Sequence, residues 1–82
     1  MSTPPFTVLG LLKKIRGYLE KITEIEDVRL EDDMRIAKVI LQQNSISFTK
    51  LLLILEIMIE YSYAIEEIAV EDGKLVLIFE RT

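Results

Sequence analysis

The chain has 82 residues, half of them apolar, and its ten basic and fourteen acidic residues give a formal net charge of −4. We expect residues 1–82 to form a single small domain with a modest core. The chain has neither histidine nor cysteine, which excludes zinc sites, thiolate nucleophiles and imidazole bases, and the negative charge argues against a dedicated nucleic-acid binder.

Composition also suggests where the protein works. Small secreted domains are often held together by disulfides and no signal peptide is visible, so we expect a cytoplasmic protein. The longest purely aliphatic run, residues 51–55, is far shorter than the roughly 20 apolar residues that cross a bilayer, so no membrane partner is expected. Twelve isoleucines, ten glutamates and only three amide side chains resemble the composition of proteins from hot-living organisms.

A shift of 40 residues aligns the chain with itself, residues 6–41 on residues 46–81. At this register the helix-capping residues, the apolar helix stripes and the hairpin turns of the two halves all coincide. Such agreement between independent structural signals favours a true internal repeat. The alignment predicts an α+β fold of two αββ units, in the order αββαββ. Its four strands should form a mainly antiparallel sheet with both helices on one face.

The first unit opens with a predicted amphipathic helix. Thr7 is a natural N-cap, and Phe6 before it can pack on Leu11 as a hydrophobic staple. Apolar residues then recur at three- and four-residue spacing and predict one core-facing stripe, made of Val8, Leu11, Leu12, Ile15, Tyr18, Leu19 and Ile22.

The opposite face of this helix is basic. Two glycines, Gly10 and Gly17, make it smooth, and residues 1–23 carry a net charge of +3 while residues 24–82 carry −7. Such a face is a candidate contact for an acidic protein or for the phosphates of a nucleic acid. Its cations are Lys13, Lys14, Arg16 and Lys21.

Residues 26–30 alternate as a strand does, but residues 34–41 are ambiguous. The repeat and the β-branched side chains favour a strand after a turn at Asp32-Asp33. The alternative is a helix capped by Asp32, which would produce a fold similar to a winged helix-turn-helix, a nucleic-acid-binding regulator with residues 48–63 as recognition helix. Glu56 and Glu60 oppose that function, because recognition helices present basic or amide side chains to DNA.

The second helix should start at the N-cap Ser47, with Ile46 and Leu51 as its staple. By the repeat, its core stripe should contain Phe48, Leu51, Leu52, Leu55, Met58 and Ile59. Polar residues fill only a narrow stripe, so this helix has more apolar surface than a two-layer domain of this size covers. The residues expected to stay uncovered are Leu53, Ile54, Ile57 and Tyr61.

The chain closes with a predicted hairpin. Asp72-Gly73 suits a two-residue type I′ turn, which would pair Glu71 with Lys74 and Val70 with Leu75. The strand over residues 74–80 is apolar on both faces, so Val76 and Ile78 should lie on an open sheet face and extend the uncovered surface.

These patterns predict a small non-catalytic protein that works through protein–protein contacts. It would self-associate as a homo-oligomer or serve as an accessory subunit of a larger intracellular heteromeric complex. The predicted interface is Leu53, Ile54, Ile57, Tyr61, Val76 and Ile78. We expect no enzyme activity, no cofactor and no catalytic or metal-binding residues, because Asp32 and Asp33 suit an exposed turn and Ser45 and Ser47 suit helix capping.

Overall fold

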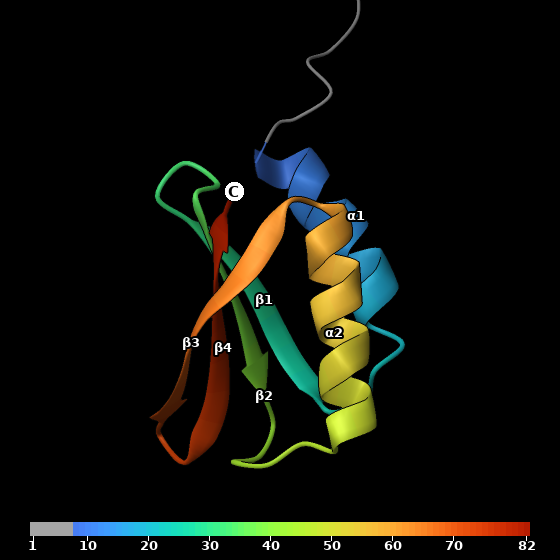
Figure 1. Ribbon diagram of the computed structural model, residues 1–82, viewed down its shortest axis with the longest axis vertical. Coiled ribbons are helices and arrows are strands. Elements are labelled where there is room, and N and C mark those ends of the chain that lie inside the picture. Colours follow the sequence, from blue (N-terminus) through green and yellow to red (C-terminus); the bar gives the residue numbers. More distant parts are fainter. Residues whose placement is uncertain (1–7) are drawn as a thin grey trace, which may run out of the picture.

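A computed structural model describes residues 8–82, whose elements follow the order αββαββ (Figure 1). The four strands form one antiparallel sheet in the order β1-β2-β4-β3, with both helices on one face, which confirms the predicted α+β fold. Within residues 8–82 no helix is both long enough and apolar enough to cross a bilayer. The elements are α1 (Val8–Leu19), β1 (Ile25–Glu31), β2 (Ile36–Leu41), α2 (Phe48–Glu60), β3 (Tyr63–Glu71) and β4 (Lys74–Arg81).

The two hairpins meet at the central strands β2 and β4. Lys38 pairs with Ile78, 40 residues further along the chain. The same shift relates the two neighbouring pairs: Ala37, which pairs with Phe79, corresponds to Leu77, and Val39, which pairs with Leu77, corresponds to Phe79. The central ladder therefore has two-fold symmetry, which lets positions on β1 be compared with positions on β3. The sequence repeat itself stays a prediction.

A single core lies between the helices and the sheet. Each large aliphatic side chain buried there contributes about 1.5–3 kcal/mol relative to an exposed one. The predicted stripe of α1 is confirmed at Leu11, Ile15, Leu19 and Ile22, whereas Tyr18 is exposed. The predicted Thr7 cap and Phe6 staple lie outside the described residues. The buried cluster contains Leu11, Ile15, Leu19, Ile22, Val28, Ala37, Val39, Leu41, Ile54, Met58, Tyr63, Leu77 and Phe79.

Helix α2 begins as predicted, since Ser47 is its N-cap and accepts a hydrogen bond from the Lys50 amide at 3.3 Å. Its core face is only partly the predicted one. Met58 is fully buried and Leu51 and Leu55 pack against the core, as the repeat predicted. Ile54 is fully buried against expectation, whereas Phe48 is 72% and Ile59 65% exposed.

Compared with α1, α2 is turned by about 100°, or one residue step, around its axis. The reason is chemical. Where the first unit has Lys14, Gly17 and Lys21, the second has Ile54, Ile57 and the C-cap Tyr61, so the most apolar arc of α2 lies one step away from that of α1. This arc packs against the core together with Leu51, Leu55 and Met58. The remaining members of the stripe predicted from the repeat, Phe48, Leu52 and Ile59, stay exposed.

The turn of the first hairpin is longer than expected. Glu31 pairs with Ile36, so four residues connect β1 and β2 where the repeat predicted two, and the alternative of a helix over residues 34–41 is wrong. Asp32, Asp33 and Met34 all have positive φ, between 54° and 70°. The Tyr63 hydroxyl donates a hydrogen bond to the Met34 carbonyl and so ties this turn to the start of β3.

The second hairpin has the predicted register. Glu71 pairs with Lys74 and Val70 with Leu75, and both Asp72 and Gly73 have positive φ, as a type I′ turn requires. Because this turn is two residues shorter than that of the first hairpin, the β3–β4 ladder runs two pairs further. Figure 1 shows this end of the hairpin extending away from the helices.

Candidate interaction surface

The predicted interface residues of α2 do not form one exposed patch. Only Leu53 is exposed. The predicted exposure of Ile54 is wrong, because its side chain is fully buried between the helices and the sheet. Ile57 and Tyr61 are half-buried against the core, and the Tyr61 ring contacts the Tyr18 ring of α1 with centroids 6.2 Å apart.

The sheet face opposite the helices does not expose the predicted apolar side chains either. Val76 is buried and Ile78 half-buried, although no helix covers this face. Lys38, which pairs with Ile78 there, is held by Glu31 at 3.3 Å. The prediction of an uncovered apolar strand face was therefore wrong, because neighbouring side chains on the same face shield it.

The exposed apolar side chains gather elsewhere, along α2 and the adjacent edge strand β3. Tyr61 faces α1, so the opposite flank of α2 points away from α1 and lies over β3, the strand that α2 contacts. Six of the nine large apolar side chains that are exposed among residues 8–82 lie on this flank or on β3. We call them the α2–β3 surface: Phe48, Leu52, Ile59, Ile65, Ile68 and Val70.

The symmetry of the sheet shows how far β3 departs from β1. Val28 pairs with Val39 and Ile65 with Phe79, so Val28 and Ile65 hold equivalent places on the two edge strands. Val28 is 2% exposed beneath α1, whereas Ile65 is 39% exposed. Ile68, which is equivalent to the half-buried Leu30, is 53% exposed. Helix α1 therefore covers its edge strand, and α2 leaves the helix-facing side of its own strand open.

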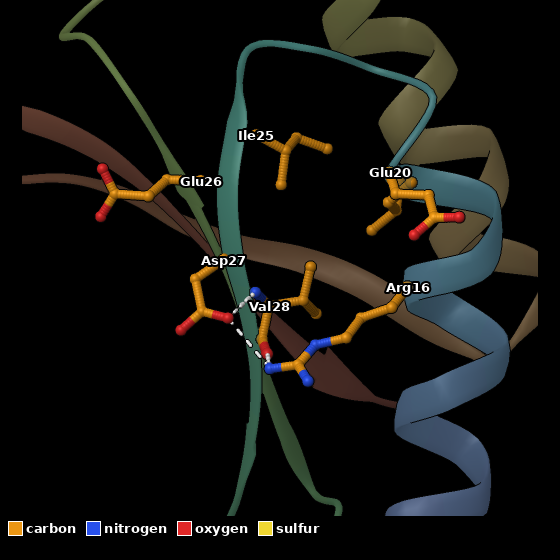
Figure 2. A pocket seen from close by; sticks show the side chains of 7 residues that line it. Arg16, Glu20, Ile25, Glu26, Asp27 and Val28 are labelled. Carbon is orange, nitrogen blue, oxygen red and sulfur yellow. Dashed lines mark hydrogen bonds and ion pairs between the residues drawn. The ribbon is translucent and has the colours of Figure 1, made fainter.

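Besides being covered by α1, β1 has side chains bonded to the backbone groups on its unpaired edge (Figure 2). Arg16 extends from α1 across a small pocket of about 140 Å³ and donates hydrogen bonds to the Val28 carbonyl and the Asp27 carboxylate, both at 2.9 Å. The same carboxylate accepts a hydrogen bond from the Val28 amide at 2.8 Å. Side chains therefore occupy both backbone groups of Val28, and an added strand could not pair there. Partial burial raises the pKa of Asp27, but hydrogen bonds from Arg29 and the Val28 amide, with the Arg16 charge, hold that pKa below its usual value.

The edge of β3 has no such block. Along residues 63–71 no side chain of the described chain is hydrogen-bonded to the backbone of Ile65, Ile68 or Val70. With α2 rotated by one residue step, the helix position equivalent to Arg16 is the apolar Leu55, which cannot form such hydrogen bonds. An uncapped nine-residue edge strand invites pairing with another chain.

Acidic side chains border the α2–β3 surface. Glu56 and Glu60 lie on the outer face of α2, and β3 carries Glu66, Glu67 and Glu71, all of them exposed. A hydrogen bond and like-charge repulsion from Glu80 raise the pKa of Glu66 above its usual value. The surface is thus an apolar strip inside a negative border.

The basic face was predicted on α1, the helix that contacts β1 at the opposite edge of the sheet from β3. Lys13, Lys14 and Lys21 are exposed and form no ion pair with any described residue. Arg16 is engaged with Asp27 and Val28 and is not available to a partner in this arrangement. A Cβ added at Gly17 would meet no atom within 4 Å, so the helix surface there is open.

Sequence reasoning missed both the α2–β3 surface and the capped edge of β1. The only sequence signal for the surface was the excess of apolar residues on α2, which did not say which of them face inward. Among residues 8–82 no three Asp or Glu side chains are grouped to hold a metal ion. Comparison of the chain with models of protein families, with curated proteins and with solved structures finds no match in any of the three.

Proposed function

We propose that this protein is a non-catalytic interaction module that binds another protein through the α2–β3 surface. The observation that carries the proposal is the concentration of exposed large apolar side chains on one flank, beside an uncapped sheet edge. Contiguous apolar patches rimmed by polar residues usually mark interaction sites. The module would act as an accessory subunit of a larger assembly.

The structural role of these side chains is small, which favours a role in binding. A residue that stabilises the chain itself is buried, as Ile54 is, whereas Phe48 and Ile59 keep about two thirds or more of their surface in water. Exposed apolar groups contribute little to folding and gain most of their burial free energy only when a partner covers them.

We do not extend the proposal to nucleic acids. With Arg16 engaged by Asp27, the predicted basic face retains only Lys13 and Lys14 on α1 and Lys21 just after it, and the chain as a whole is negatively charged. Nucleic-acid binding depends on neutralising several phosphates. The winged-helix alternative required a helix where β2 lies, so it is dropped. A cytoplasmic location remains part of the proposal and is based on the cysteine-free composition.

The proposal is tested with the double variant Ile59→Glu/Ile68→Glu, which puts two charges on the α2–β3 surface. Both positions are exposed, so we expect a folded protein whose unfolding free energy lies within about 1 kcal/mol of wild type. Its association should weaken at least roughly tenfold, the effect of losing more than one interface anchor. Sedimentation equilibrium measures self-association, and quantitative cross-linking in the source cells measures association with other proteins.

The matched control is Leu9→Glu, since Leu9 is an equally exposed apolar residue on α1. It should leave association unchanged. A folded double variant that keeps the same mass in solution and the same cross-linked proteins as wild type would show the proposal to be wrong.

A further inference from the structure

We infer that the α2–β3 surface receives an extended segment of a different protein, which joins the sheet as a fifth strand beside β3 and in which large apolar residues alternate with Lys or Arg. This inference rests on the proposed function and specifies the partner. It is argued from the backbone of β3, from its two faces and from its charge.

The backbone of β3 is ready to pair. In an antiparallel ladder, hydrogen-bonded and non-hydrogen-bonded pairs alternate. Glu71 and Lys74 close the two-residue turn as a hydrogen-bonded pair, so the N–H and C=O groups of Ile68 and Val70 point away from β4. These are the groups that an added strand would use. At the corresponding edge of β1, the groups of Val28 are already occupied by Arg16 and Asp27.

The two faces of β3 require alternating side chains in the partner. On the helix-facing side Ile68 and Val70 are exposed, so partner residues opposite them must be apolar to gain burial. On the other face Glu67 and Glu71 flank Ala69, and directly opposed side chains of paired strands lie about 4.5–5.5 Å apart. Partner residues opposite these glutamates are best matched by Lys or Arg. A segment that meets both demands alternates apolar and basic residues.

Charge also argues against a second copy of this chain as the occupant. β3 carries Glu66, Glu67 and Glu71 and no basic residue, so two β3 strands paired in any antiparallel register would bring like charges together without a compensating cation. Paired about Ala69, for example, Glu67 of one copy would lie opposite Glu71 of the other, and opposed like charges destabilise a sheet. The other edge strand, β1, presents Asp27 and Glu31 beside Arg29 and is capped at Val28. Within residues 8–82 neither edge supplies the alternating apolar and basic segment.

The β-bulge limits the length of the segment. The register between β3 and β4 shifts between Ile65 and Glu67, so the regular edge extends from Glu67 to Glu71. At about 3.4 Å per residue this edge is roughly 17 Å long. Partner pairing should therefore be confined to this stretch, because a bulge bends the strand and interrupts the ladder.

The test uses the whole chain and a short, end-blocked synthetic peptide in which lysine alternates with valine and isoleucine. Two control peptides share its length: one has glutamate in place of lysine, and the other carries N-methyl groups on alternate amides. Calorimetry should give binding of the lysine peptide that is at least roughly tenfold tighter than that of either control. Hydrogen exchange followed by NMR should show new protection at the amides of Ile68 and Val70.

A charge-reversed variant distinguishes lost binding from misfolding, because a misfolded protein would not bind the opposite peptide more tightly. Glu67→Lys/Glu71→Lys changes two exposed side chains. It should reverse the preference, so that the glutamate peptide binds more tightly than the lysine peptide.

The inference is wrong if the lysine peptide fails to bind, if its N-methylated form binds equally well, or if protection appears on α1 or β1. It is also wrong if wild type self-associates through β3. In each of these cases a loss of association in Ile59→Glu/Ile68→Glu would leave the proposed function standing. An unchanged association in that double variant would instead remove the proposed function itself.

Discussion

Each edge strand of the sheet lies beside one helix, but the β1 edge is covered whereas the β3 edge is exposed. At one edge, α1 covers β1 and Arg16 bonds to Asp27 and Val28, so the apolar face and the backbone are both shielded. At the other edge, α2 turns a different arc toward the core and leaves β3 open. The difference originates in a few side chains, because Lys14 and Gly17 of α1 correspond to Ile54 and Ile57 of α2.

This difference shows how the edge of one αββ unit can be covered and that of another left open without a change of fold. Rotating a helix by about one residue changes which side chains reach the edge strand. In the first unit the guanidinium of Arg16 lies there, whereas the equivalent position on the rotated α2 is the aliphatic Leu55. Exposed edge strands are normally protected, and the open edge of β3 is therefore where we propose that a partner binds.

The largest effect should come from testing which face of α2 is inside. Ile54→Ala removes a fully buried side chain and should lower the free energy of unfolding by about 2–5 kcal/mol. Leu52→Ala, on the β3 side of the same helix, removes a side chain that stays partly in water and should lower it by less than about 1 kcal/mol. Urea unfolding measures both. Equal losses would contradict the observed helix rotation.

A smaller effect is expected from removing the cap of the β1 edge. Arg16→Met keeps the apolar stem but loses the hydrogen bonds to Val28 and Asp27, and the half-exposed guanidinium should contribute only about 1 kcal/mol. The Val28 amide should also exchange faster with solvent. Lys13→Met, on the same helix but without an ion pair among the described residues, is the control and should change neither quantity.

This cap also gives stability a pH dependence. The folded pKa of Asp27 is lowered, so its contribution is present above the unfolded value of about 3.9 and is lost as pH falls through the folded pKa. The loss of stability between pH 7 and pH 3 should therefore be smaller in Arg16→Met than in wild type. A larger loss in the variant would contradict the assigned role of Arg16.

The smallest effect should come from the acidic border of β3. Glu66 lies beside Glu80, which raises its folded pKa, so its contribution to stability is present below the unfolded pKa and is lost as pH rises through the folded pKa. Glu66→Gln should therefore raise the melting temperature slightly at pH 7, and the gain should disappear at pH 4. Differential scanning calorimetry at the two pH values measures this, and a lower melting temperature at pH 7 would contradict it.

The parts of the fold that were predictable from the sequence depend on local chemistry. Asp72-Gly73 fixes its own turn type and hence the pairing of Glu71 with Lys74, and Ser47 is a capping residue wherever a helix follows it. The turn at Asp32-Asp33 was less predictable. Aspartate tolerates positive φ without requiring it, so residue types alone did not distinguish a two-residue from a four-residue connection.

The candidate surface could not be assigned because it depends on the rotation of α2. The repeat assigned the core face of α2 from that of α1. The apolar Ile54, Ile57 and Tyr61, with the contact between Tyr61 and Tyr18, turn a different side of α2 inward. The cap formed by Arg16 and Asp27 could not be predicted from the sequence either. Its prediction requires both the rotation of α1 and the position of β1 at an edge of the sheet.

The hydrogen bond from the Tyr63 hydroxyl to the Met34 carbonyl has a consequence for the order of folding. Left-handed conformations cost roughly 1–2 kcal/mol per residue, so the turn with Asp32, Asp33 and Met34 is poorly stable before β3 arrives. The C-terminal hairpin, closed by a favourable turn, should form early, and the first turn should reach its final shape late. Tyr63→Phe would then accelerate unfolding in stopped-flow experiments and leave the refolding rate almost unchanged.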